Sequence, residues 1–128
     1  MRTSCLCLMA MVLAHSISWA EDVTPITPAE AAKKINEKVV VKMEVLSAGG
    51  NNNNYLNSEK DYTDAKNFTI FIGKNDIPKF RKAGIETPSD YYLEKTIQVT
   101  GKVVLENNKP WIKVTEPDQI KVVEKEKK

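Results

Sequence analysis

The stretch at residues 96–105 constrains the fold of this chain more than any other part of its sequence. Apolar side chains occupy every second position there, at Ile97, Val99, Val103 and Leu105. A period of two residues predicts a long β-strand with one buried face. Gly101 interrupts the apolar row, which indicates a bulge or a sharp bend of the kind that lets a small sheet curl. The chain is therefore expected to fold around a strand that bends in its middle.

A second strand is predicted directly after this one. Residues 106–110 are typical of a turn, and an apolar segment follows from Trp111 to Val114. Pro110 stands at the start of that segment, where its missing N–H group costs little. The two segments therefore predict a β-hairpin with a longer loop.

The first twenty residues differ in kind from the rest of the chain. Arg2 is their only charged residue, residues 5–14 are apolar, and Ser18 and Ala20 are small residues at the two positions that a signal peptidase reads. This pattern predicts a secretory signal peptide over residues 1–20 and an exported protein, periplasmic or secreted. A membrane anchor is the alternative, but the apolar run is too short to span a bilayer. We therefore expect no stable membrane insertion after cleavage.

Cleavage after Ala20 would limit the chemistry of the mature chain. Both cysteines and His15, the one histidine, lie in the first twenty residues. Without them the mature chain can form no disulfide, Cys or His zinc site, thiol nucleophile or Ser-His-Asp triad. The carboxylates show no paired spacing typical of acid–base catalysis, and no glycine-rich phosphate loop is present. We therefore expect no enzymatic activity, no metal site and no cofactor.

The net charge is close to zero. The full chain has 19 Lys and Arg residues against 17 Asp and Glu residues, and loss of Arg2 would leave 18 against 17, a balance of +1. Such a balance provides no global field to attract nucleic acid or anionic lipid. Any basic surface must therefore be local.

The remaining strands are predicted from the same alternation and from the turn residues between them. Five segments are predicted as the main strands: residues 38–46, 55–57, 67–72, 96–105 and 111–114. A bend at residues 117–119 and a last short strand at residues 120–123 follow them. Residues 47–54 contain two glycines and four consecutive asparagines, which predicts a polar loop. That loop either binds a ligand or is a linker that tolerates changes of sequence.

Two short helices are predicted. The segment Thr27-Pro28-Ala29-Glu30 has the residues of a capping box, so a helix is expected to begin there and to end near Asn36. Apolar residues recur at helical spacing over residues 76–83, which predicts a helix between the third and fourth strands. Residues 89–93 predict a turn or a single helical turn.

These elements predict a mostly β fold. A five-stranded Greek-key barrel of the OB-fold type matches the strand order, with a short helix in front and a helix between strands three and four. A plain antiparallel meander with one helix is the competing architecture. One core is expected to hold six residues of shared strand phase: Val41, Met43, Ile70, Val99, Val103 and Ile112. The domain organisation is predicted as residues 1–20 signal peptide, 21–26 leader, 27–123 OB-fold-like domain and 124–128 charged tail.

Several short motifs carry a resemblance to a known family. In the first half these are Tyr55-Leu56-Asn57, Tyr62, Asn67-Phe68-Thr69 and Lys79-Phe80. The second half matches better, at residues 99–103, 108–112 and 117–120. Together they resemble a family of small exported bacterial OB-fold domains described as nucleic-acid-binding. The resemblance covers residues 29–123 and implies an OB-fold with a binding function. The asparagine-rich segment and the near-neutral charge depart from a typical nucleic-acid binder.

The candidate binding site follows from the predicted fold. In an OB-fold the ligand lies across the middle strands, between the loops that join strands one to two and four to five. On this chain those loops are residues 47–54 and 106–110. Single-stranded nucleic acid requires aromatic faces for stacking and cations for phosphates. The candidate ligand-binding residues are three aromatic residues and four lysines: Lys42, Tyr55, Phe71, Lys102, Lys109, Trp111 and Lys113.

Each candidate residue also has a purely structural interpretation. Phe71 could cover a second small core under the first helix, and Trp111 could seal one end of the barrel. Lysines on an outward strand face are commonly just solvated. Two hypotheses for function stay open: an exported module that binds single-stranded nucleic acid or another extended polymer, and an envelope or stress-associated module that binds a protein partner. The sequence predicts nothing about the oligomeric state.

Overall fold

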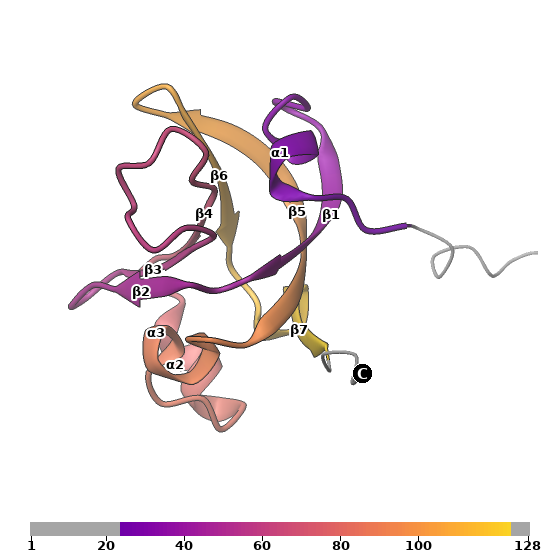
Figure 1. The fold of residues 1–128 in the computed structure, drawn as a ribbon. Coiled ribbons are helices and arrows are strands. Elements are labelled where there is room, and N and C mark those ends of the chain that lie inside the picture. Colours follow the sequence, from indigo (N-terminus) through magenta and orange to yellow (C-terminus); the bar gives the residue numbers. More distant parts are fainter. Residues whose placement is uncertain (1–23, 124–128) are drawn as a thin grey trace, which may run out of the picture.

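One curled sheet dominates the fold, with short helices at its ends (Figure 1). The computed structural model describes residues 24–123, so the predicted signal peptide and charged tail lie outside the described residues. The described chain forms seven strands: β1 (Lys38–Glu44), β2 (Ser47–Gly49), β3 (Asn54–Asn57), β4 (Thr69–Ile72), β5 (Thr96–Glu106), β6 (Lys109–Val114) and β7 (Ile120–Val123).

The order of pairing makes the sheet a barrel. The strands pair in the order β1-β5-β6-β4-β3-β2, and β7 pairs with β5. The first and last strands of this order, β1 and β2, are consecutive in the chain. The Val45 N–H donates to Lys95 O at 2.9 Å and so extends the β1–β5 pairing, while the Leu46 N–H donates to Asn57 O at 3.0 Å and extends the β2–β3 pairing. The chain therefore changes partner strand between these two residues.

Gly101 lies where β5 also changes partner. Residues 96–102 of β5 pair with β1, and residues 103–106 pair with β6. A Cβ atom on Gly101 would lie 2.6 Å from Ile112 Cγ2, so a larger residue would collide with the adjacent strand. Figure 1 shows β5 curving through this region. The predicted bend is confirmed, and the close approach of Ile112 of β6 explains why a glycine stands there.

Three short helices and one 3-10 turn connect the strands. They are α1 (Pro28–Ala31), α2 (Ile77–Lys82), α3 (Pro88–Tyr92) and the 3-10 turn at Pro117–Gln119. Both halves of the predicted capping box at Thr27 and Glu30 are present. None of the helices in the described residues is long and apolar enough to cross a membrane.

The segments around α1 differ from the sequence-based expectation. The helix ends at Ala31 rather than near Asn36, and the chain continues in turns, with the Lys34 N–H donating to Ala31 O at 2.9 Å. Asn36 then adopts a left-handed conformation with φ of 71°, and its N–H donates to Val103 O at 2.6 Å. Ile26, expected in a loose leader, pairs with β1 instead: its N–H donates to Val40 O at 2.8 Å. The β-sheet thus competes for backbone groups on both sides of this helix.

The core is the one predicted from strand phase. All six predicted core residues are buried, with exposures of 4% or less: Val41, Met43, Ile70, Val99, Val103 and Ile112. Phe80 and Tyr92 add large buried rings from α2 and α3. The helices between β4 and β5 therefore close one end of the barrel.

The fold class is confirmed and the strand count is wrong. The described residues form seven strands rather than the five of the predicted barrel, because β2 lies inside the segment predicted as a loop and the last strand predicted at residues 120–123 also joins the sheet, as β7 beside β5. The residues of β2 have no alternation of their own and form a strand only because β3 lies beside them. The pairing of β4 with β6 is parallel, which excludes the antiparallel meander.

Candidate nucleic-acid interface

Three aromatic side chains gather on the outer face of the sheet. Tyr55 of β3, Phe71 of β4 and Trp111 of β6 each lie next to a buried core residue, so the strand alternation turns them outward. The rings of Phe71 and Trp111 stack, with centroids 5.2 Å apart and an interplanar angle of 21°. Tyr55 meets both rings edge-on, at 5.4 Å and 5.9 Å. All three residues are half-buried.

Strand register explains why these rings meet. Tyr55 lies opposite Phe71 in the antiparallel β3–β4 pair. The parallel β4–β6 pair then places Phe71 opposite Lys113 and Thr69 opposite Trp111. Residues separated by up to 56 positions in the sequence are therefore neighbours on one surface. The cluster formed by Tyr55, Phe71 and Trp111 is called the aromatic platform below.

A pocket of about 660 Å³ opens beside the aromatic platform. Tyr55 and Trp111 line it, together with residues 47–50 on one side and the β5–β6 hairpin on the other. These are parts of the two loops that the sequence predicted to flank a ligand. The segment that joins β3 to β4 supplies the third side, and Figure 1 shows it as a long loop beside the β5–β6 hairpin.

The segment between β3 and β4 is tied to the barrel by buried amides. Asn67 Nδ2 donates to Asn57 Oδ1, to Thr69 Oγ1 and to Tyr62 O, each at 3.2 Å. Asn67 Oδ1 accepts from the Glu59 N–H at 3.1 Å. Asn57, Thr69 and Asn67 are all buried. The pocket therefore has one wall whose position depends on a polar network rather than on apolar packing.

Asp61 stabilises the outer turn of the same segment. Its Oδ1 accepts from Thr63 Oγ1 at 2.6 Å and from the Thr63 N–H at 2.9 Å. These two hydrogen bonds lower the pKa of the Asp61 carboxyl, and the nearby Lys109 charge adds a smaller effect in the same direction. The Asp61 carboxylate therefore brings negative charge close to a lysine that lines the pocket.

The four candidate lysines do not all gather at this site. Lys109 lines the pocket, and Lys113 lies opposite Phe71 but forms an ion pair with Glu106 at 2.7 Å. Lys42 of β1 lines a different and smaller hollow. Lys102 is exposed on β5 opposite Lys38 and does not line the pocket. Five of the seven candidate residues are thus brought together, and Lys42 and Lys102 are not.

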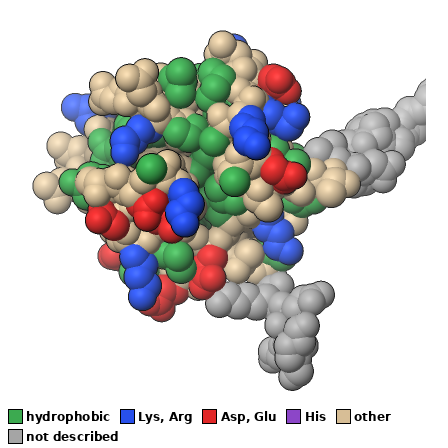
Figure 2. All heavy atoms as spheres, turned by 45° about the horizontal axis from the view of Figure 1, so that its top comes forward, with side chains coloured by type: hydrophobic (Ala, Val, Ile, Leu, Met, Phe, Trp, Pro, Cys, Tyr) green, Lys and Arg blue, Asp and Glu red, His purple; other side chains and the backbone are tan. Residues whose placement is uncertain are grey.

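The face of the molecule drawn in Figure 2 shows no dominant charge. On the face drawn in Figure 2, lysines and acidic side chains are interspersed among hydrophobic ones. This agrees with the near-neutral net charge of the chain. Electrostatic attraction of phosphates to this face is therefore weak and confined to a few residues.

Outside the two predicted loops, sequence reasoning missed five residues that line the pocket: Asn57, Lys60, Tyr62, Thr63 and Thr69. A signal for Asn57 was present, because it shares the outward strand phase of Tyr55. Lys60 and Tyr62 lie in an irregular segment, where no periodicity predicts which side chains face the sheet.

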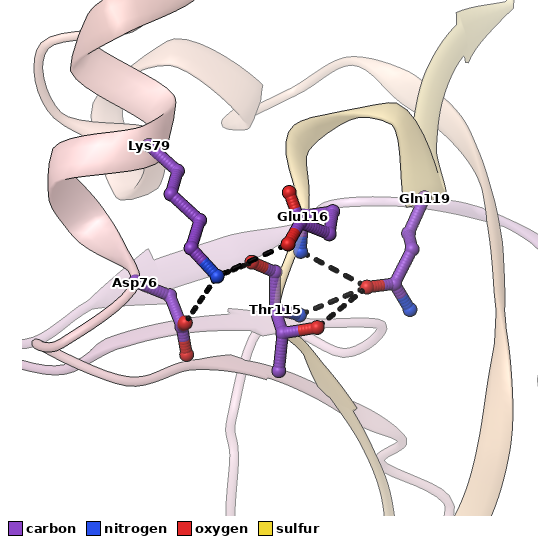
Figure 3. Close-up of polar contacts among 5 residues, drawn as sticks. All are labelled: Asp76, Lys79, Thr115, Glu116 and Gln119. Atoms are coloured by element: carbon purple, nitrogen blue, oxygen red, sulfur yellow. Dashed lines mark hydrogen bonds and ion pairs between the residues drawn. The ribbon is translucent and has the colours of Figure 1, made fainter.

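A second polar cluster joins α2 to the connection between β6 and β7 (Figure 3). Lys79 Nζ lies 3.3 Å from Asp76 Oδ1 and 3.0 Å from Glu116 Oε2. Both contacts raise the pKa of Lys79, and the contact with Glu116 has the larger effect. Gln119 Oε1 accepts from the N–H groups of Thr115 and Glu116 at 2.9 and 3.0 Å. Gln119 Nε2 donates to the Thr100 carbonyl oxygen at 2.9 Å. These contacts join the β6–β7 connection to α2 and to β5, so the cluster has a structural role.

The part of the chain that the structure describes contains no group of three or more His, Cys, Asp or Glu residues able to hold a metal ion. The platform and its pocket are suited to holding a flat, weakly charged ligand. Aromatic faces, amides and a few lysines line this surface.

Comparison with known proteins identifies the fold. No protein-family model matches this sequence, and no curated protein matches it. Among solved structures, the OBody AM1L10 bound to hen egg-white lysozyme superposes with a TM-score of 0.56 and 15% identity, over 79% of this chain and 92% of that one. The barrel described above is therefore an OB-fold.

Two aspartyl-tRNA synthetases show the same likeness. The enzyme from Entamoeba histolytica has a TM-score of 0.55 and 17% identity over 87% of this chain and 24% of its own. The chain assigned as the enzyme from Leishmania major Friedlin has a TM-score of 0.52 and 16% identity, over 88% of this chain and 23% of its own. This chain thus spans about a quarter of the length of these synthetases, and at such identities the likeness concerns the fold alone.

Proposed function

We propose that this OB-fold is an exported, non-enzymatic binding module that holds single-stranded nucleic acid across the aromatic platform. One observation carries the proposal: three half-buried rings from three strands form one continuous surface beside a 660 Å³ pocket. The two loops that flank ligands in OB-folds border this pocket. The similarity to structures of aspartyl-tRNA synthetases, which act on a nucleic acid, is consistent with the proposal.

The rings are better explained by a ligand than by packing alone. Phe71 and Trp111 face outward from the barrel, so they contribute little to the core that the inward residues fill. Half-exposed aromatic rings on an outer sheet face are the surface on which unstacked bases bind, each contact contributing about 1–3 kcal/mol. Stacking is therefore expected to supply most of the binding free energy, because the lysines nearby are few.

The decisive experiment is fluorescence anisotropy with a labelled single-stranded oligonucleotide of mixed sequence. Trp111→Ala is expected to weaken binding by about 1–3 kcal/mol, the value of one stacked base. Tyr91→Ala is the matched control, because Tyr91 is an exposed aromatic residue on α3 that is not part of the platform. It should leave the affinity unchanged.

Absence of binding at about 20 mM salt, where phosphate attraction is least screened, would overturn the proposal. The hypothesis of a protein partner would then be the better one. The Lys113–Glu106 ion pair favours that alternative, because it neutralises the lysine closest to Phe71 in strand register. The OBody with the same fold was solved bound to a protein, hen egg-white lysozyme.

Export is a separate part of the proposal. It rests on the apolar segment and on the small residues Ser18 and Ala20 before the acidic residues Glu21 and Asp22. N-terminal sequencing of the protein recovered from outside the cytoplasm should begin at Glu21. Recovery of a chain that still begins at Met1 would contradict export by signal cleavage.

A further inference from the structure

Asn57 has an unusual position for a polar residue. It is 6% exposed, lies on the outward phase of β3 two residues after Tyr55, and lines the pocket. Its side-chain oxygen accepts two hydrogen bonds, from Thr69 Oγ1 at 3.0 Å and from Asn67 Nδ2 at 3.2 Å. Two converging donors identify that atom as the oxygen, so the amide nitrogen points away from them.

The amide nitrogen of Asn57 has no acceptor within residues 24–123, the part of the chain that is described. A buried donor without a partner is costly, and native proteins pair such groups with protein, water or ligand. Here the donor belongs to a residue that borders an open pocket rather than the closed core. At the wall of the pocket, Asn57 therefore combines an amide nitrogen without an acceptor in the described residues with an oxygen that is already occupied.

The other walls define the shape of a suitable ligand. Tyr55 lies two residues from Asn57 on the same strand, about 7 Å away at the usual rise of a strand. Trp111 follows in the same cross-strand row, because Asn57 lies opposite Thr69 and Thr69 lies opposite Trp111. A flat ring that stacks on the platform can thus bring its edge to the Asn57 amide. A volume of 660 Å³ accommodates a base with its sugar.

We infer that Asn57 reads the edge of an unstacked base in this pocket and selects keto bases over amino bases. This inference rests on the proposed function. Guanine presents O6, and thymine or uracil presents O4, and each of these keto oxygens can accept from Asn57 Nδ2. Cytosine and adenine present an amino group at the same edge. That group needs an acceptor, and the Asn57 oxygen is already occupied by Thr69 and Asn67.

The test compares two pyrimidine oligonucleotides that differ at this edge. Labelled dT15 has an oxygen at position 4 of each base and dC15 has an amino group; dU15, which lacks the C5-methyl group of thymine, is the control and should bind like dT15. The wild-type protein should bind dT15 roughly tenfold more tightly, the discrimination expected of a specific base contact. Anisotropy titrations at low salt measure both dissociation constants.

Asn57→Asp is the informative variant. The carboxylate keeps an oxygen that accepts from Thr69 and Asn67, and it replaces the N–H donors with a second acceptor. The ratio of the dissociation constants for dC15 and dT15 should therefore fall to about one or invert in favour of dC15. The readout is the ratio of the two dissociation constants, because the new charge weakens binding of both oligonucleotides. Asn75→Asp adds the same charge at an exposed turn outside the pocket and should keep the wild-type ratio.

The outcomes separate this inference from the proposed function. Equal affinity of the wild type for dT15 and dC15 overturns base selection and leaves nucleic-acid binding intact. A preference that persists in a folded Asn57→Asp variant overturns the role of Asn57. Failure of the wild type to bind either oligonucleotide at low salt overturns the proposed function itself. Circular dichroism and thermal unfolding of each variant establish that it is folded.

Discussion

At the scale of single residues, burial in the barrel decides which positions tolerate change. Val103 is fully buried between β1 and β6, while Val122 of β7 is 46% exposed. The two are the same residue type in the same sheet. They therefore have the same intrinsic strand propensity and differ in burial.

Val103→Ala is expected to lower the free energy of unfolding by about 1–3 kcal/mol, through lost apolar burial and a small cavity. Val122→Ala should change it by no more than about 0.5 kcal/mol, the range of surface substitutions. Urea unfolding followed by circular dichroism measures both. Equal effects of the two substitutions would contradict the register of β5.

Tyr92 predicts how stability depends on alkaline pH. It is 2% exposed, and its hydroxyl has no hydrogen-bond partner in the described part of the chain. Burial raises the pKa of Tyr92 to about 12, above the ordinary tyrosine value of 10.0. The protonated form is thus favoured in the folded state. Above pH 10 the unfolded chain loses this proton first, so stability falls between pH 10 and pH 12.

Tyr92→Phe should remove this part of the alkaline destabilisation. The difference in unfolding free energy between variant and wild type should be constant below pH 10 and should grow in favour of the variant up to pH 12. Every other ionisable group is the same in both proteins, so the difference isolates Tyr92. A difference that stays flat from pH 8 to pH 12 would show that Tyr92 ionises equally in both states.

At the scale of elements, hydrogen bonds from single side chains hold the connections between strands. Gln119 accepts from three groups of the β6–β7 connection and donates to Thr100 of β5. Lys79, in the same cluster, forms only exposed ion pairs and one bond to a carbonyl oxygen (Figure 3). Exposed ion pairs contribute little because solvent screens them.

Gln119→Ala is therefore expected to be the more damaging of two substitutions in one cluster. It should lower the unfolding free energy by about 1–2 kcal/mol, because it leaves several backbone groups without a partner. Lys79→Ala should have a clearly smaller effect. Thermal unfolding of both variants decides the order, and a larger loss in Lys79→Ala would mean that α2, rather than β5, holds this connection.

At the scale of the whole molecule, the near-neutral charge predicts weakly salt-dependent binding. Few lysines border the pocket, chiefly Lys60 and Lys109. Each phosphate contact to a single strand contributes a slope of about 0.7 to the dependence of log affinity on log salt concentration. A total slope of about 1 to 2 is therefore expected.

Lys109→Ala should lower that slope by roughly 0.7 to 1 and weaken all sequences about equally. Lys121→Ala is the control, because Lys121 is exposed on β7 and does not line the pocket. Anisotropy titrations at four salt concentrations give the slope for each protein. An unchanged slope in Lys109→Ala would show that Lys109 makes no phosphate contact.

Much of the site could be predicted because strand phase is a local property. The outward phase of Tyr55, Phe71 and Trp111 follows from their buried neighbours in sequence. The phase of Lys42 and Lys102 was equally clear, yet neither lysine lines the pocket. Phase determines which face of a strand a residue occupies. It does not determine where around a curled sheet that face lies.

The sequence by itself determined the strands with clear alternation, the six predicted core residues and the bend at Gly101, because each depends on neighbours along the chain. Only the tertiary structure decided that β2 forms at all, that β4 pairs with β6 in parallel, and that the Asn57 amide borders the pocket. The physical reason is that pairing and hydrogen bonding join residues far apart in sequence. Their partners exist only once the barrel has closed.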